Sequence, residues 1–405
     1  MVNSRKNILF AHSGGVTSVV NTVAASIYQC AKKDGRDMHI ARYGINGLFD
    51  LDFLLASDIA DQEWDKIIYT PGSSFGSSRR RLPKDEETLQ KLFTYLDKHN
   101  IGLFFCNGGN NSQCITRDMQ EAADQMGYPL QCIGIPKTID NDIYHTDTCP
   151  GYGSVAKYTA TSVYEMSLDL AAMCHGSTQL LIYESMGRSS GWIAAAAMLA
   201  KQGERSAPHL ILVPEATFSI QQVITRIQET ISLYGHCVVV LAEGADDTDR
   251  ILSANQSKYT YKSIYLNQLI KSQLNIRSHV VIPDYLQRSA RHLGSKTDVE
   301  QTIALSQYAY QLGIEGQSRI MVTIKRDSNS PYVWSTSMVT LDKIAGKERC
   351  LPQYFIHEDQ LQMTPQCLEY LKPLIFGEDY PVYNQGIPAY SHLIYSNTKE
   401  NKENL

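Results

Sequence analysis

The sequence predicts an α/β protein with two Rossmann-like, parallel-sheet domains, on the strength of three observations. The chain has 405 residues and 43% hydrophobic content, which is enough for two packed domains. Short apolar runs of strand length alternate with segments of helical periodicity. Glycine and polar residues follow these runs directly. Because ligands bind at the carboxyl ends of parallel strands, we expect the segments after the strands to form the functional site.

The first half of the chain predicts four strands with helices between them. The strands are expected at 7–11, 39–43, 102–106 and 130–135. The first helix is expected to end at about Lys33, and the next two helices to span 86–99 and 115–126. Thr17 or Ser18 is predicted to cap the first helix. The preceding glycine pair, Gly14 and Gly15, would let free backbone N–H groups approach an anion.

Residues 70–81 combine glycine and serine with three consecutive arginines, Arg79, Arg80 and Arg81. The guanidinium group offers a fixed fork of donors that fits a phosphate, so this loop is a candidate phosphate clamp. The alternative interpretation is a solvated basic loop.

The segment 133–142 places a lysine beside two carboxylates, namely Lys137, Asp140 and Asp142. This combination suits phosphoryl transfer, since the cation can neutralise charge on the moving group and a carboxylate can take the hydroxyl proton. Asp140 and Asp142 are two residues apart, so in an extended segment they would point the same way. The alternative is a solvated turn with a surface ion pair, and the polar segment 107–113 nearby favours the functional interpretation.

The second half repeats the alternation. Strands are predicted at 179–183, 209–213 and 236–242, and helices at 155–173, 191–199, 221–234 and 299–312. The polar residues after these strands indicate a second ligand-binding unit.

Composition excludes several other classes of protein. A net charge of -5 argues against a general nucleic-acid-binding protein. Nine cysteines without a CxxC pair predict reduced thiols rather than disulfides or zinc. No apolar run approaches the roughly 20 residues of a membrane span, and we expect no secretory leader, so a cytoplasmic location is predicted.

These motifs, in this order, resemble the phosphofructokinase family from residue 7 to about 380, and most closely its pyrophosphate-dependent branch. The matching segments are 12–15, 72–79, 108–112, 136–142, 186–188, 243–244 and 285–288.

The resemblance implies that Asp140 removes the proton from the 1-hydroxyl of fructose 6-phosphate, with Asp142 supporting it. It implies that Thr138 bonds the transferring group and that Lys137 supplies positive charge there. The substrate-binding residues it implies are Gly15, Arg79, Asn110, Asn111, Ser112, Met186, Gly187, Arg188, Glu243, Arg277, Tyr285 and Arg288. Tyr285 and Arg288 would hold the 6-phosphate. Mg²⁺ is the implied cofactor, with Asn110 and Asp142 as its candidate ligands.

The resemblance also implies two domains of the phosphofructokinase type with the active site between them. The donor domain would span 1–154 plus about 289–340, the sugar-phosphate domain 155–288 plus about 341–392, and 393–405 would be a disordered tail. Pyrophosphate and fructose 6-phosphate are the expected partners, in a reversible reaction of glycolysis or gluconeogenesis. A homodimer or homotetramer is expected, with neither nucleic acid nor membrane.

Two departures keep alternatives open. Asn110 and Asn111 stand where this branch usually has aspartate, so an ATP-dependent phosphofructokinase and a catalytically weakened, sugar-phosphate-binding regulatory subunit are the competing hypotheses. Arg277 and His279 are both candidates for one arginine of the family, because His279 has the better spacing to Tyr285. A dinucleotide oxidoreductase is excluded, since no G-x-G-x-x-G follows the first strand.

Overall fold

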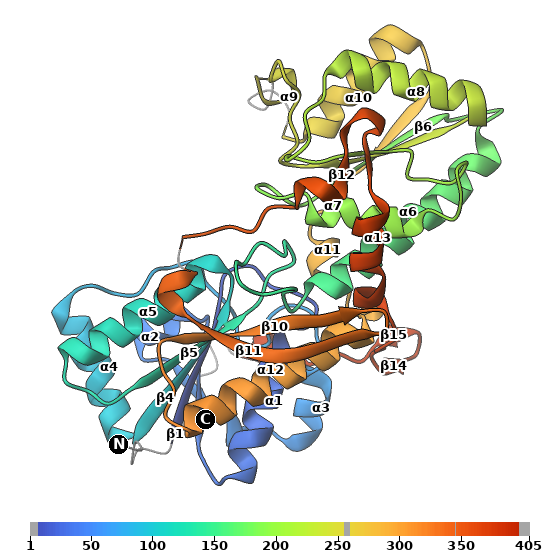
Figure 1. The fold of residues 1–405 in the computed structure, drawn as a ribbon. Coiled ribbons are helices and arrows are strands. Elements are labelled where there is room, and N and C mark those ends of the chain that lie inside the picture. Colours follow the sequence, from blue (N-terminus) through green and yellow to red (C-terminus); the bar gives the residue numbers. More distant parts are fainter. Residues whose placement is uncertain (1–6, 255–259, 345, 397–405) are drawn as a thin grey trace. The chain divides into compact units, whose positions relative to one another are not determined.

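The computed structural model of the chain describes residues 7–254, 260–344 and 346–396 (Figure 1). These residues separate into two compact units. Unit 1 lies within Met1–Ser154, Arg288–Glu348 and Gly377–Leu405, and unit 2 comprises Val155–Gln287 and Arg349–Phe376. Residues 377–392, which the sequence analysis placed with the second domain, group with unit 1. None of the helices in the described ranges is both long and apolar enough to cross a membrane.

Unit 1 is built on a seven-stranded sheet with the strand order β11-β10-β5-β4-β1-β2-β3. Its strands are β1 Asn7–Ser13, β2 Met38–Ala41, β3 Phe53–Leu55, β4 Ile101–Gly108, β5 Gln131–Pro136, β10 Ile320–Asn329 and β11 Tyr332–Thr340. The inner strands pair in parallel, whereas β3 and β11 are antiparallel at the two edges. The predicted parallel sheet is therefore confirmed, and the β10–β11 hairpin is an addition that the sequence analysis did not foresee.

Alternation along β1 buries both faces of this sheet. Ile8 and Phe10 point to one core, which α1 Val20–Lys33, α3 Asp61–Ile67 and α12 Lys296–Ile314 complete. Leu9 and Ala11 point to the other, which α2 Ile45–Asp50, α4 Glu86–Lys98 and α5 Asn110–Gln125 cover. Strands buried on both faces are continuous apolar runs in sequence, which explains why they were recognisable.

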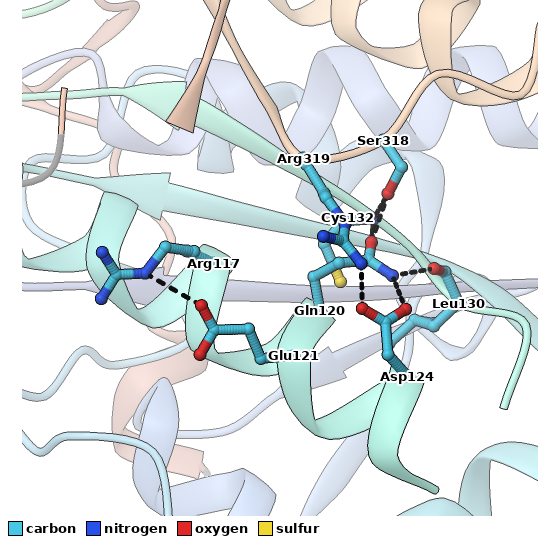
Figure 2. Close-up of polar contacts among 8 residues, drawn as sticks. All are labelled: Arg117, Gln120, Glu121, Asp124, Leu130, Cys132, Ser318 and Arg319. Atoms are coloured by element: carbon cyan, nitrogen blue, oxygen red, sulfur yellow. Dashed lines mark hydrogen bonds and ion pairs between the residues drawn. The ribbon is translucent and has the colours of Figure 1, made fainter. Parts of the chain in front are cut away.

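Polar contacts fix α5 to the sheet at the end farthest from its first turn (Figure 2). Gln120 donates to the Leu130 carbonyl at 3.0 Å and accepts from the Cys132 N–H at 3.2 Å. Asp124, one turn further along, pairs with Arg319 at the start of β10. These contacts hold α5 against both β5 and β10, so its N-terminal turn has a fixed place at the carboxyl end of the sheet.

Two helix starts differ from the sequence prediction. The N-cap of α1 is Val19 and makes no side-chain cap bond, so the predicted cap at Thr17 or Ser18 is wrong. Helix α5 begins at Asn110 rather than near residue 115, because the chain turns into the helix directly after Gly109. The predicted loop residues Asn110 and Ser112 therefore lie in the first turn of a helix.

The C-terminal part of unit 1 is anchored by a buried charge. Arg291 is fully buried and pairs with Asp379, and its guanidinium lies 4.9 Å from the Tyr69 ring centroid. The remaining elements of unit 1 are η1 Ala56–Asp58, η3 Arg291–Leu293, η4 Leu341–Lys343, β14 Tyr383–Asn384, β15 Ile387–Pro388 and α14 Leu393–Ser396. The predicted disordered tail begins too early, because α14 occupies its first four residues. Its remainder, 397–405, lies outside the described residues.

Unit 2 contains a four-stranded parallel sheet with the order β7-β8-β6-β9. Its strands are β6 Leu180–Ser185, β7 Leu210–Leu212, β8 Cys237–Ala242 and β9 Ser278–Val281, and one short antiparallel pair adds β12 Ile356–His357 and β13 Gln362–Met363. The helices are α6 Tyr152–Met173, α7 Trp192–Ala196, η2 Ala197–Ala200, α8 Ile220–Tyr234, α9 Ile251–Ala254, α10 Lys262–Leu274, α11 Leu286–Ser289, η5 Gln353–Phe355, η6 Glu358–Gln360, α13 Pro365–Leu371 and η7 Lys372–Ile375. The second predicted α/β unit is confirmed, and β9 is a strand that the sequence analysis did not predict.

Candidate active site

The turn after β1 and the glycine-serine loop form one structure in unit 1. Gly14 donates its N–H to the Ser78 carbonyl at 2.8 Å, and its own carbonyl accepts from Ser77 Oγ at 2.8 Å. Gly14 has φ +81°, a left-handed conformation that glycine adopts without strain. The loop that contains Arg79 is therefore held directly against the first turn.

Lys137 crosses from the end of β5 to this turn. Its Nζ donates to the Ser13 carbonyl at 2.9 Å and to the Gly15 carbonyl, and only 1% of the residue is exposed. Its backbone N–H donates to the Gly108 carbonyl at 3.0 Å. An ammonium group thus lies beneath the glycine turn, although more than 120 residues separate the two segments.

Three cations converge on the Gly14–Gly15 turn. A Cβ atom built on Gly15 would lie 3.5 Å from Arg288 Nη1 and 3.9 Å from Arg79 Nη2, and one on Gly14 would lie 4.0 Å from Lys137 Nζ. Like charges this close repel, and a bound anion would relieve the repulsion. The three cations beside this turn make it a candidate phosphate site.

The pKa of Lys137 is lowered to about 7, chiefly by burial; the Cys106 thiol opposes this shift, and the nearby Arg288 and Arg79 contribute to it. The charged form of Lys137 is disfavoured until an opposite charge arrives. A phosphate group would supply that charge and raise the pKa again.

His12 adds no fourth charge. Burial lowers the pKa of His12 to about 3, with a further contribution from Lys137. Its Nδ1 accepts from the Asn107 amide at 3.0 Å, and the ring stacks on Phe75. His12 is therefore neutral and packs beneath the turn.

The predicted catalytic segment is bent rather than extended, which corrects the argument from two-residue spacing. Asn141 has φ +52°, and its Oδ1 accepts from the Cys149 N–H at 3.0 Å, so the chain turns between the two aspartates. Thr138 connects them instead. Its hydroxyl is 3.4 Å from Asp140 Oδ2, it accepts from the Asp140 N–H at 3.1 Å, and it also bonds Asp142.

Asp142 and Asn110 present oxygen atoms from neighbouring segments. Burial raises the pKa of Asp142, and the Glu348 carboxylate raises this pKa further. The Asn110 amide donates to the Lys347 carbonyl at 2.7 Å, and its buried Oδ1 has no hydrogen-bond partner among the described residues. Glu348 forms an isolated β-bridge with Ile143, the residue after Asp142. The 347–348 segment therefore contacts both the segment of Asp142 and Asn110.

The first turn of α5 adds backbone donors. Gly109 is its N-cap and has no side chain to occupy the free N–H groups, and Ser112 is 1% exposed beside Gly108. Asn111 is exposed. The N-terminus of a 16-residue helix favours an anion, in agreement with the cations nearby.

In unit 2, the segment after β6 is held by side chains that accept from its backbone. Gln287 Oε1 accepts from the Met186 N–H at 2.8 Å, and Glu243 Oε1 accepts from the Gly187 N–H at 3.3 Å. Gly187 has φ +123°, and a Cβ there would lie 2.5 Å from the Ser190 carbonyl oxygen. Glycine is thus required at 187, and the place of the next residue, Arg188, is fixed.

The loop after β8 meets this segment. The Gly244 N–H donates to the Gly187 carbonyl at 3.1 Å, and a Cβ on Gly244 would lie 2.0 Å from the Arg188 carbonyl oxygen. Unit 2 therefore brings Met186, Gly187, Arg188 and Glu243 together, as predicted. Arg188 is exposed, and so is Tyr285, at 69%.

Arg277 lies at the other end of this sheet. It directly precedes β9, and its carbonyl accepts from the N–H groups of Gln179 and Leu180 at the start of β6. Because Gly187 follows the carboxyl end of β6, unit 2 does not bring Arg277 beside it. The alternative, His279, is exposed in β9 opposite Leu181.

Sequence reasoning missed two supporting residues. Glu184, at 4% exposure, accepts from the Ser263 N–H at 2.8 Å, and burial raises the pKa of Glu184. Gln287 holds Met186. Glu184 could have been noticed as an acid at the end of an apolar strand, but no local pattern marks Gln287 as the partner of Met186.

Known proteins are similar to this chain over nearly its full length. Residues 7–309 match the family model described as phosphofructokinase. The pyrophosphate–fructose 6-phosphate 1-phosphotransferases of Halomonas elongata and Xanthomonas campestris are each 40% identical, with 96% of both chains covered. The crystal structure of pyrophosphate-dependent phosphofructokinase from Marinobacter aquaeolei superposes with a TM-score of 0.88 at 40% identity, covering 95% of each chain.

Proposed function

The chain belongs to the phosphofructokinase family, and we propose that it is the phosphotransferase that moves a phosphoryl group from pyrophosphate to the 1-hydroxyl of fructose 6-phosphate. The products are fructose 1,6-bisphosphate and phosphate, and the reaction is reversible. One observation supports this proposal above all others: Lys137, Arg79 and Arg288 surround a glycine turn in unit 1. A loop with two aspartates directly follows Lys137 in the chain.

The proposed chemistry uses these groups in named roles. The sugar 1-hydroxyl gives its proton to Asp140 as its oxygen forms a bond to phosphorus, and the bridging P–O bond of pyrophosphate breaks to release phosphate. Thr138 orients Asp140. The three cations neutralise charge that spreads over the phosphoryl oxygens in the transition state. In the reverse direction, Asp140 returns the proton.

Arg288 has a different proposed partner from the one the resemblance implies. Its guanidinium approaches Gly15 within unit 1, beside Arg79 and Lys137. We therefore assign Arg288 to the transferred phosphoryl group rather than to the 6-phosphate alone. Asn111 and Ser112, in the first turn of α5, are the proposed partners of the other end of the donor.

Asn110 and Asp142 are suitable ligands for Mg²⁺. They offer a buried amide oxygen without a hydrogen-bond partner among the described residues and a carboxylate with a raised pKa, and hard cations prefer such oxygen ligands. Clusters of three or more His, Cys, Asp or Glu side chains that could hold a metal are absent from the described ranges. The protein would therefore supply few ligands. When bound, Mg²⁺ would neutralise charge on the phosphoryl oxygens.

For the sugar, we propose the backbone of Met186 and Gly187 with the side chains of Arg188 and Glu243 in unit 2. Glu243 accepts from one N–H and has a second carboxylate oxygen for a sugar hydroxyl. The exposed Tyr285 is the proposed 6-phosphate contact. The cytoplasmic location, the homo-oligomeric state and the pathway stay predictions from the sequence.

A coupled assay run in parallel with pyrophosphate and with ATP tests the proposal. Lys137 occupies the space beneath the donor turn, which leaves less room for the α-phosphate of a nucleotide. We expect fructose 1,6-bisphosphate to form with pyrophosphate at a rate far above that with ATP. A rate with ATP well above the pyrophosphate rate would refute the donor assignment. Binding of fructose 6-phosphate without turnover at any Mg²⁺ concentration would instead favour a regulatory subunit.

A further inference from the structure

Asn21 is a buried polar residue that no part of the proposed chemistry uses. It is the second residue of α1 and is fully buried. Its Nδ2 donates to the carbonyls of Thr70 at 2.8 Å and Gly72 at 2.7 Å, and its Oδ1 accepts from the Ser74 N–H at 3.0 Å. Every hydrogen-bonding site of the amide except one oxygen lone pair is thus spent on the backbone of residues 70–74.

Those residues begin the loop that contains Arg79. Gly72 has φ +72°, a left-handed conformation, at the point where Asn21 holds the loop. After Ser74, the Phe75 carbonyl accepts from the Tyr43 N–H at 2.8 Å. The loop then reaches Ser77 and Ser78, which bond to Gly14.

The loop therefore has two points of attachment on the turn and helix that follow β1. Ser77 and Ser78 fix its far end at Gly14, and Asn21 fixes its near end on α1. Arg79 follows directly, with its Nη2 3.9 Å from the place of a Gly15 Cβ. Arg79 itself is exposed, so packing around its side chain does little to hold it in place.

We propose that Asn21 is a positioning residue, which sets the place of Arg79 by holding residues 70–74 against the start of α1. The inference rests on the proposed function in one respect, that Arg79 contacts the pyrophosphate donor. Asparagine suits this task because a single short side chain supplies two donors and an acceptor. Aspartate has the same size but would turn a negative charge toward two carbonyls.

The test measures steady-state kinetics of the full chain with pyrophosphate and fructose 6-phosphate. In Asn21→Ala, we expect the KM for pyrophosphate to rise about ten-fold, because three hydrogen bonds to the loop are lost. The KM for fructose 6-phosphate should change by less than about two-fold, whereas kcat should fall as well, because Arg79 also neutralises charge in the proposed transition state. Asn21→Asp should show the same pattern. Asn21→Ser keeps one short donor, so its KM for pyrophosphate should lie between those of Asn21→Ala and the wild type.

The matched control is Asn7→Ala. Asn7 also joins two segments through its amide, to the His99 carbonyl at 2.9 Å and from the Asp37 N–H at 3.1 Å, but it lies at the amino end of β1. The Asn7→Ala substitution should lower the melting temperature without changing the KM for pyrophosphate.

A double-mutant cycle separates positioning from general destabilisation. In the Arg79→Ala background, Asn21→Ala should raise the KM for pyrophosphate by less than about two-fold, because the residue it positions is gone. The same factor in both backgrounds, or an unchanged KM in all folded Asn21 variants, would overturn the inference. A wild-type enzyme that does not use pyrophosphate would overturn the proposed function instead. If Asn21→Ala does not fold, the same double-mutant cycle is measured with Asn21→Ser.

Discussion

Unit 1 and unit 2 prepare for anionic ligands in different ways. In unit 1, the buried amine of Lys137 and two guanidinium groups surround one glycine turn, so basic groups are gathered there before any ligand binds. In unit 2, the segment after β6 is held by neutral and acidic acceptors, and Arg188 is exposed. The first arrangement brings like charges together, and a phosphate would relieve their repulsion. The second fixes the shape of a backbone and leaves the charged side chain free to adjust.

This difference separates the expected effects of mutation. Changes at the charge centre of unit 1 should alter the rate of phosphoryl transfer, because charge develops there in the transition state. Changes in unit 2 should alter the affinity for the sugar, because binding depends on the shape of the loop.

Asp140→Asn should have the largest effect. It removes the proton acceptor but keeps the size of the side chain and an oxygen for the Thr138 hydroxyl, so kcat should fall by about a thousand-fold or more with the fold intact. The control is Asp147→Asn in the same segment, where Asp147 pairs with Arg326 at 3.0 Å. A kcat within about ten-fold of wild type in Asp140→Asn would show that the base lies elsewhere.

Lys137→Met should come next. It removes the ammonium at similar volume, so kcat/KM for pyrophosphate should fall by about a hundred-fold. The melting temperature should stay within about 4 °C of wild type, since removal of a desolvated charge offsets the lost hydrogen bonds. Lys262→Met is the matched control, a buried lysine of unit 2 that donates to the Ala245 carbonyl at 2.7 Å. It should leave the KM for pyrophosphate unchanged.

Glu243→Ala should have a smaller effect of a different kind. Loss of the acceptor for the Gly187 N–H loosens the segment after β6, and the KM for fructose 6-phosphate should rise about ten-fold. The KM for pyrophosphate should not change. Glu215→Ala removes a carboxylate that likewise accepts backbone N–H groups, from Gly191 and Leu351, and it should alter stability more than either KM. Equal changes in both KM values for Glu243→Ala would remove the contrast between the units.

The smallest effect concerns pH. Because the pKa of Lys137 is about 7 in the free protein, kcat/KM for pyrophosphate should decline as pH rises above 7, by up to about ten-fold per pH unit. Pyrophosphate binding should take up a proton in that range, which calorimetry in buffers of different ionisation enthalpy measures. Lys137→Met should lose both effects.

The stability of the free protein should depend on pH in the opposite direction. The pKa of Lys137 is lowered from 10.5 to about 7 in the folded state, so the unfolded chain binds more protons between these values. This group therefore makes the fold more stable as pH rises from about 7 to 10.5, and that gain is lost as pH falls back through 7. Comparison of thermal unfolding in the wild type and in Lys137→Met isolates its contribution.

Much of the fold was visible in the sequence because parallel strands are buried on both faces. The apolar runs at 7–11, 102–106 and 236–242 correspond to β1, β4 and β8. Gly187 and Glu243 could be predicted as neighbours, since both follow parallel strands of one sheet.

Other features depend on contacts between distant segments. Nothing near Lys137 indicates that its ammonium group bonds the carbonyls of Ser13 and Gly15. The early start of α5 was missed because Asn110 to Ser112 are polar residues with little helix propensity, and the turn follows from packing. Asn141 bends the catalytic segment through a bond to Cys149, which spacing alone does not reveal.

The burial around Lys137 also governs the reactivity of its sulfur neighbour. Burial raises the pKa of Cys106 to about 11, so the residue is a protonated thiol at neutral pH. Alkylating agents and peroxides attack thiolates rather than thiols, and they need access to the sulfur atom. Cys106, at the proposed phosphoryl-transfer centre, is therefore a poor target for oxidation, and iodoacetamide should label the exposed Cys350 well before it inactivates the enzyme.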